Sequence, residues 1–135
     1  MSFKEKSAWV MGAIMLATGV FYAQLVAEAP PQAPVIGPLI PYVLAVIVFS
    51  VVAQVGLAIA SPKEASAPAD EREKIVIDRA GHWSGMVMGV LAVAACAAYV
   101  AAPEGAMLFH YIIGALIVAQ LAEYAFQIVL LRRPI

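Results

Sequence analysis

Four polar side chains in one apolar segment near the C-terminus have the types and spacing that chemistry inside a membrane requires. Gln120, Glu123, Tyr124 and Gln127 are spaced i, i+3, i+4 and i+7, which places them on one face of a helix. A carboxyl group in lipid serves proton transfer, cation binding or recognition of a polar ligand, or forms hydrogen bonds that hold helices together. Gln54 is expected at a similar depth as a partner of Glu123. A ligand-binding site formed by these five residues and simple packing both remain open.

The sequence carries none of the motifs on which common catalytic sites depend. It has no nucleophile elbow, phosphate-binding loop, metal-ligand cluster or pair of catalytic acids. His82 and His110 are predicted near opposite membrane faces, so they cannot bind one haem together. The single cysteine, Cys96, excludes an intramolecular disulfide. We therefore expect a protein that is not an enzyme and that binds no metal and no cofactor.

The elements that position these side chains are predicted to be membrane-spanning helices. The chain has 135 residues, of which 64% are hydrophobic and 13% are charged. Four segments reach the roughly 20 apolar residues that cross a bilayer; they are Ala8–Ala27, Leu39–Ala60, Gly81–Ala101 and Ala106–Leu131. The segments lack the alternation of a barrel strand, and helices satisfy their own backbone groups in lipid. The fold class is therefore all-α, an integral membrane four-helix bundle in the lipid bilayer.

The basic residues gather in three places along the chain. They are Lys4 and Lys6, then Lys63, Arg72, Lys74 and Arg79, then Arg132 and Arg133. By the positive-inside rule, both termini and the central linker are expected in the cytoplasm. The net charge of −1 gives no reason to expect direct binding of nucleic acid.

Aromatic and imidazole side chains recur near the ends of the predicted spans. Such residues commonly lie at the boundary between lipid and water, where an apolar ring and a polar tip are both accommodated. We therefore expect interfacial positions for Tyr22, Tyr42, Trp83, Tyr99 and Tyr111, and for His82 and His110.

The two halves of the chain align with each other without a gap at an offset of 77 residues. Val10–Gly12 recurs as Val87–Gly89, and Tyr22 aligns with Tyr99. This predicts two tandem helical hairpins, residues 7–60 and 70–133, joined by a cytoplasmic linker at residues 61–69. Both hairpins begin and end on the same side, so the internal repeat is parallel, with a pseudo-twofold axis along the membrane normal.

Small residues are spaced four apart on the third predicted span. Gly81, Gly85 and Gly89 expose bare backbone on one helix face, and Ala8 and Gly12 are their counterparts on the first span. We expect these five residues to pack the first and third spans against each other, with the second and fourth spans outside. A monomeric bundle and a homodimer are both compatible with such faces.

A charged segment precedes the third span and is predicted to continue it. Asp70 and Glu73 have the spacing of a capping box, so a helix begins there, and nothing stops it before Ala101. At 1.5 Å per residue this helix is about 46 Å long, whereas the hydrocarbon core is about 30 Å thick. Two or three turns, called the spur, must project into the cytoplasm. Lys74 is expected to pair with Asp70 and Asp78 at i,i+4 spacing, and residues 61–69 are expected to form a loop.

The spur sequence, Asp70-Glu71-Arg72-Glu73-Lys74-Ile75-Val76-Ile77-Asp78-Arg79-Ala80, also resembles a known signature. It is similar to the D-E-R…R/K-A pattern before the third span in a family of small four-span prokaryotic membrane proteins of unknown function. The resemblance covers about 15 residues plus the hairpin layout, and it implies the prokaryotic cytoplasmic (inner) membrane. Some members resemble partners of helix-turn-helix repressors, which implies a signalling role.

Two interpretations of the spur follow. It is either a solvated extension at the lipid headgroups or a docking surface, because Ile75–Ile77 is an apolar run that cannot face lipid on all sides. The expected partner-binding residues are Glu71, Arg72, Lys74, Ile75, Asp78, Arg79 and His82. The first hypothesis is a non-enzymatic signalling or regulatory subunit with a cytoplasmic regulator as partner. The alternatives are a small transporter, channel or lipid- or ligand-binding protein that uses Glu123, and an accessory subunit of a larger membrane complex.

Overall fold

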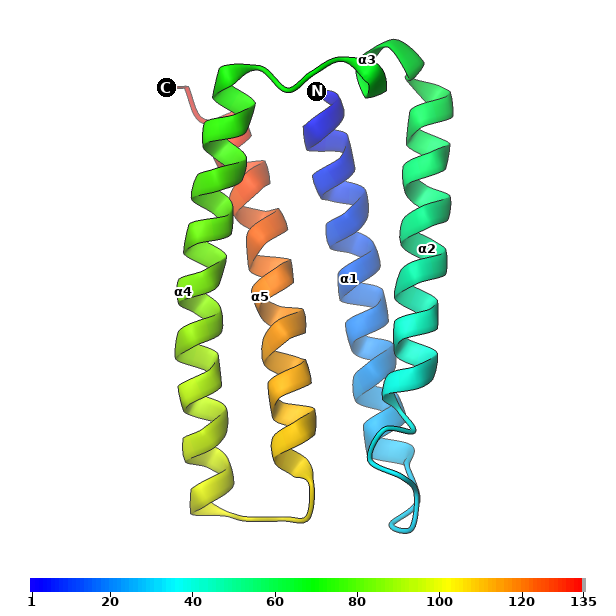
Figure 1. Cartoon of the computed structure of the whole chain (residues 1–135), viewed down its shortest axis with the longest axis vertical. Coiled ribbons are helices and arrows are strands. Elements are labelled where there is room, and N and C mark those ends of the chain that lie inside the picture. The colour runs from blue at the N-terminus through cyan, green and yellow to red at the C-terminus, as the bar shows by residue number, and fades with distance from the viewer. Residues whose placement is uncertain (135) are drawn as a thin grey trace.

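The computed structural model describes residues 1–134 and contains helices alone as regular elements in that range. Four helices are long and apolar enough to cross a membrane, and they pack as an all-α bundle (Figure 1). This confirms the predicted class, a multi-pass membrane protein with four candidate spans. The helices are α1 (Phe3–Glu28), α2 (Leu39–Ala60), α3 (Pro62–Ser66), α4 (Glu71–Ala101) and α5 (Met107–Arg132).

Helix α4 begins where the capping residues predict. The Glu73 amide donates to Asp70 Oδ1 at 2.7 Å, and the Asp70 amide donates to Glu73 Oε2 at 3.2 Å, so both arms of the capping box are present. The helix then continues without a break to Ala101. The predicted continuity of the charged segment with the third span is therefore confirmed.

The linker is more ordered than the sequence predicted. Residues Pro62–Ser66 form the short helix α3, where a loop was expected. Pro62 lies in the first turn, where its fixed backbone angle suits a helix and its missing N–H costs nothing. At the other end of α3 the Ser66 hydroxyl donates to the Pro62 carbonyl at 2.9 Å. Pro62 therefore initiates a short helix within the segment that was expected to be a loop.

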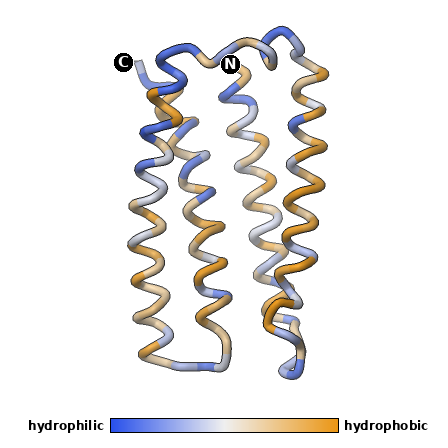
Figure 2. Tube along the Cα trace, viewed as in Figure 1, coloured by the Kyte–Doolittle hydropathy of each residue, from blue (hydrophilic) through white to orange (hydrophobic). Residues whose placement is uncertain are grey.

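Both chain termini and the linker lie at one end of the bundle, and the two hairpin loops lie at the other (Figure 1). We call these the terminus end and the loop end. Figure 2 shows hydrophilic segments gathered at the terminus end, over the start of α1, the linker, the start of α4 and the end of α5. The long helices between the two ends are mainly hydrophobic. This arrangement is typical of a bundle whose middle faces lipid.

The four long helices pack side by side in the order α2, α1, α5, α4 (Figure 1). Helix α1 packs along α2 and α5, and α4 packs along α5. The expectation that the first and third spans cross is therefore wrong, and α5 is central instead of outside. An exact twofold between the hairpins would pair the α1–α5 contact with an α2–α4 contact. Within residues 1–134, α2 and α4 do not pack along each other.

Small residues of α1 explain why α5 is its neighbour. Ala8 is 2% exposed, a Cβ on Gly12 would lie 3.5 Å from the Tyr124 Cβ, and a Cβ on Gly19 would lie 2.8 Å from the Ile117 Cγ2. The bulky side chains of α5 fill the space that the glycines leave, which two glycine faces cannot do for each other.

The glycine face of α4 points away from the rest of the chain. A Cβ on Gly81, Gly85 or Gly89 would meet no heavy atom within 4 Å. The predicted role of these three residues in packing α4 against α1 is therefore wrong for a single chain.

Aromatic side chains form the one hydrophobic cluster described in residues 1–134. Tyr22, Tyr42 and Ile117 are its buried members, and the Tyr22 and Tyr42 ring centroids are 5.2 Å apart. Both tyrosines were expected as interfacial anchors. They are buried instead because the α1–α2 and α1–α5 contacts meet at this point of α1.

Candidate functional site

Glu123 receives its hydrogen bonds from the helix turns before and after it. Gln120 Nε2 donates to Glu123 Oε2, and Gln127 Nε2 donates to Glu123 Oε1, each at 3.3 Å. All three side chains are partly buried and come from α5. Hydrogen bonds between helices were one alternative for Glu123, but the two that its side chain makes come from its own helix. Each carboxylate oxygen keeps lone-pair capacity for a further donor or a cation.

Gln54 does not reach Glu123. Its Nε2 donates to the Ser7 Oγ at 2.8 Å, which joins α2 to α1. The expected pairing of Gln54 with Glu123 is therefore wrong, because α2 packs on α1 and not on α5. The predicted polar stripe keeps its α5 residues and loses its contribution from α2.

Tyr124 belongs to the α1–α5 packing surface. Its Cβ lies where the missing side chain of Gly12 leaves space. The neighbouring residue, Glu123, is rotated by about 100° around the helix axis. The stripe therefore divides into a packing residue and three polar residues at the side of the helix.

The seven residues predicted to bind a partner are all exposed on the first turns of α4. Arg72 is nevertheless engaged within the chain, because its guanidinium donates to the carbonyls of Leu131 and Arg133 at 2.9 and 2.6 Å. These are carbonyls at the end of α5, where a cation is favourable. Lys74 pairs with Glu71 at 2.9 Å and i,i+3 spacing, so the expected pairs with Asp70 and Asp78 are wrong.

The spur has one buried face and one exposed face. Val76 is 4% exposed and Ala80 is 0% exposed. On the outer side of the helix, Ile75 is 52% exposed, and it is followed at spacings of three and four by Asp78 and His82. The apolar run at Ile75–Ile77 is thus covered in part by the protein itself, while Ile75 remains on the outer face.

The terminus end holds an ion pair that the sequence did not reveal. Arg132 Nε donates to Glu5 Oε1 at 2.6 Å, and the Arg132 guanidinium lies 5.5 Å from the ring centroid of Trp9. Lys6 and Glu64 form a second, more exposed pair at 3.4 Å. These contacts join residues 127 and 58 positions apart in the chain, so no local spacing could indicate them.

The loop end holds a neutral pair across the same two helices. The Tyr22 hydroxyl and the His110 Nδ1 are 2.7 Å apart, which joins α1 to α5. His110 was expected as an interfacial side chain. Both residues line a cavity of about 430 Å³ together with small and apolar residues of α1 and α5. The only sequence signal for this site was the position of each residue near a span end.

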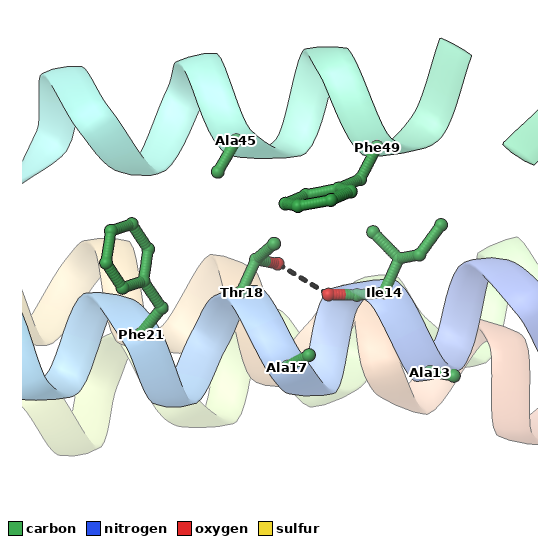
Figure 3. Close-up of a pocket in the computed structure, with 7 residues that line it drawn as sticks. All are labelled: Ala13, Ile14, Ala17, Thr18, Phe21, Ala45 and Phe49. Atoms are coloured by element: carbon green, nitrogen blue, oxygen red, sulfur yellow. Dashed lines mark hydrogen bonds between the residues drawn. The ribbon is translucent and has the colours of Figure 1, made fainter. Parts of the chain in front are cut away.

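A second hollow lies between α1 and α2, and Figure 3 shows its lining. It has a volume of about 440 Å³ and is almost entirely apolar. The hydroxyl of Thr18 turns back to the Ile14 carbonyl at 2.7 Å, so the polar atom is satisfied by its own helix (Figure 3). Phe21 and Phe49 border the hollow from the two helices. A surface of this kind suits lipid acyl chains and presents no group for specific recognition.

Comparison with known proteins finds no family model, no curated protein and no solved structure that matches the chain. The four long apolar helices agree with the four-span layout that the spur signature implies, whereas no family is identified. Within residues 1–134 no group of three or more His, Cys, Asp or Glu side chains is placed to hold a metal ion.

Proposed function

We propose that this protein is a non-enzymatic signalling or regulatory subunit of the prokaryotic cytoplasmic membrane. It consists of two tandem hairpins with both termini and the linker in the cytoplasm, and it engages a cytoplasmic protein through the spur of α4. The orientation is supported by the basic residues, since Lys6, Arg72 and Arg132 all contribute to contacts at the terminus end.

The outer face of the spur is the observation that carries this proposal. Glu71, Ile75, Asp78 and His82 follow one another at spacings of four, three and four, and all are exposed. Val76 and Ala80 hold the opposite face against the bundle. A rigid helix that offers an apolar side chain between charged ones suits recognition of a protein surface.

The test places a photo-crosslinking amino acid at position 75 in the full chain and irradiates native membranes. We expect a soluble protein to be captured at position 75 and lost when Glu71→Ala and Asp78→Ala are combined with the probe. The matched control places the same probe at position 90, since Val90 is 70% exposed on the apolar part of the same helix. Equal capture at both positions, or none at position 75, would contradict the proposal.

A second candidate function rests on Glu123. A carboxyl group on a predicted span, held by two glutamines of its own helix, suits proton or cation movement or ligand binding. In liposomes, Glu123→Gln should abolish pH-dependent flux or stabilisation by a ligand. Gln54→Leu is the control, because Gln54 bonds to Ser7 elsewhere. Behaviour of Glu123→Gln that matches the unsubstituted protein excludes this candidate.

The third candidate, an accessory subunit of a larger membrane complex, is distinguished by what copurifies. Integral membrane proteins retained in mild detergent would favour it over the regulatory role.

A further inference from the structure

The pair formed by Tyr22 and His110 leaves one hydrogen-bond donor without a protein partner. If the tyrosine hydroxyl donates to Nδ1, the neutral imidazole carries its proton on Nε2, and that N–H is free. If Nδ1 carries the proton and donates, the tyrosine O–H is free instead. In either arrangement, the hydrogen bonds within residues 1–134 offer no acceptor to the remaining donor.

Both residues of the pair line an open apolar groove between α1 and α5. Tyr22 is 4% exposed, and the cavity of about 430 Å³ extends along Val26, Gly114 and Ile117. A Cβ on Gly114 would meet no atom within 4 Å, so the backbone of α5 is bare where it lines this space. An apolar cavity with one or two convergent polar groups is the usual form of a small-molecule site.

The charge of the loop end selects among ligands. The segments 28–38 and 102–106, which form this end, contain no lysine and no arginine, and they contain Glu28 and Glu104. A phosphate or carboxylate group would meet no cation there, and desolvating its charge would be costly. The free donor therefore suits a neutral acceptor, and a carbonyl oxygen is the neutral acceptor common among lipid-soluble molecules.

We propose that the Tyr22–His110 cavity binds an apolar molecule through a carbonyl oxygen, the chemistry shared by quinones and by the ester groups of lipids. The carbonyl accepts the free hydrogen bond of the pair, and the apolar body lies against Gly114 and Ile117. The site is at the opposite end of the bundle from the spur, so it is independent of the regulatory proposal.

The experiment reconstitutes the full chain in nanodiscs of diether lipids, which have no ester carbonyl, and adds decylubiquinone. We expect its thermal midpoint to rise by about 5 °C at about ten times the dissociation constant. Gly114→Leu fills the cavity and should abolish the rise. Gly56→Leu is the control, because a Cβ there also meets nothing within 4 Å and lies on α2, away from the site.

A second measurement reports binding directly and can be interpreted even if a variant is less stable. The infrared carbonyl band of bound decylubiquinone should shift to lower wavenumber and should return to its position in lipid with His110→Phe. In discs of ester lipids without quinone, a midpoint difference between the wild type and Gly114→Leu, absent in diether discs, assigns the site to lipid esters. No effect of either carbonyl source, or equal effects in Gly114→Leu and Gly56→Leu, overturns the proposal.

Discussion

The two ends of the α1–α5 interface are held by different chemistry. At the terminus end Arg132 pairs with Glu5 and lies over Trp9. At the loop end Tyr22 and His110 share a neutral hydrogen bond. Ion pairs suit the end where the charged segments gather and water can solvate them, whereas neutral donors suit the end without lysine or arginine. The difference predicts that salt weakens one end of the interface and leaves the other unchanged.

The middle of the α1–α5 interface is stabilised by close packing, and we expect substitutions there to cause the largest loss of stability. Gly19→Ala places a Cβ 2.8 Å from the Cγ2 of Ile117, a β-branched side chain that cannot rotate away freely. Overpacking of this kind costs about 1–3 kcal/mol. Reversible unfolding by SDS in mixed micelles measures it. Gly56→Ala is the control, since its Cβ meets no atom, and equal losses for both variants would contradict close packing at Gly19.

The second-largest loss of stability is expected at the terminus end, and this loss should depend on salt concentration. Arg132→Ala leaves the buried Glu5 carboxylate without its partner and removes the contact with Trp9, which by itself contributes about 0.5–1 kcal/mol. The same unfolding assay at low and at molar salt measures the loss. We expect a smaller loss at high salt, because screening weakens the pair in the wild type. A loss that salt does not change would contradict the expected screening of this pair.

A substitution at the loop end should cost less stability, and this cost should not change with salt concentration. Tyr22→Phe keeps the ring in its cluster with Tyr42 and removes only the hydroxyl that bonds to His110. Hydrogen bonds between membrane helices contribute about 0.6 kcal/mol on average. A loss that shrinks as salt is added would contradict a neutral pair. Tyr99→Phe is the matched control, since its hydroxyl bonds to the Gly105 carbonyl within one hairpin.

The smallest effect is expected at the exposed ion pair of the linker. The Lys6 and Glu64 side chains are 36% and 53% exposed at a separation of 3.4 Å. Lys6→Ala should therefore cost no more than about 0.5 kcal/mol, and molar salt should remove the difference. A cost comparable to that of Gly19→Ala would mean that α3 anchors the bundle more firmly than its contacts indicate.

The sequence predicted the boundaries of the helices better than it predicted which helices pack against each other. The boundaries of α2 and the start of α4 were predicted correctly, because apolar length and the Asp70–Glu73 spacing are local signals. The partner of α1 was predicted wrongly, since glycine spacing marks a face that permits close approach without saying which helix approaches. Gln54 was predicted to pair with Glu123 only because both lie at a similar predicted membrane depth. That depth does not indicate which helices are adjacent, and Gln54 bonds to Ser7 instead.

The candidate sites show the same contrast between contacts within one helix and contacts between helices. The Gln120, Glu123 and Gln127 contacts follow from helical spacing within α5 and were visible as a stripe in the sequence. The Tyr22–His110 pair joins residues 88 positions apart, and its cavity exists only where α1 and α5 meet. No spacing in the sequence carries that information.

The amino-acid sequence by itself determined that four helices are long and apolar enough to cross a membrane, because backbone groups in lipid must be satisfied within each segment and enough apolar residues are present in each. Only the tertiary structure decided which helices touch. All four helices are similarly apolar, so hydrophobicity does not distinguish among their neighbours. The choice depends on whether a side chain such as Ile117 or Tyr124 fits the space left by a glycine on the facing helix.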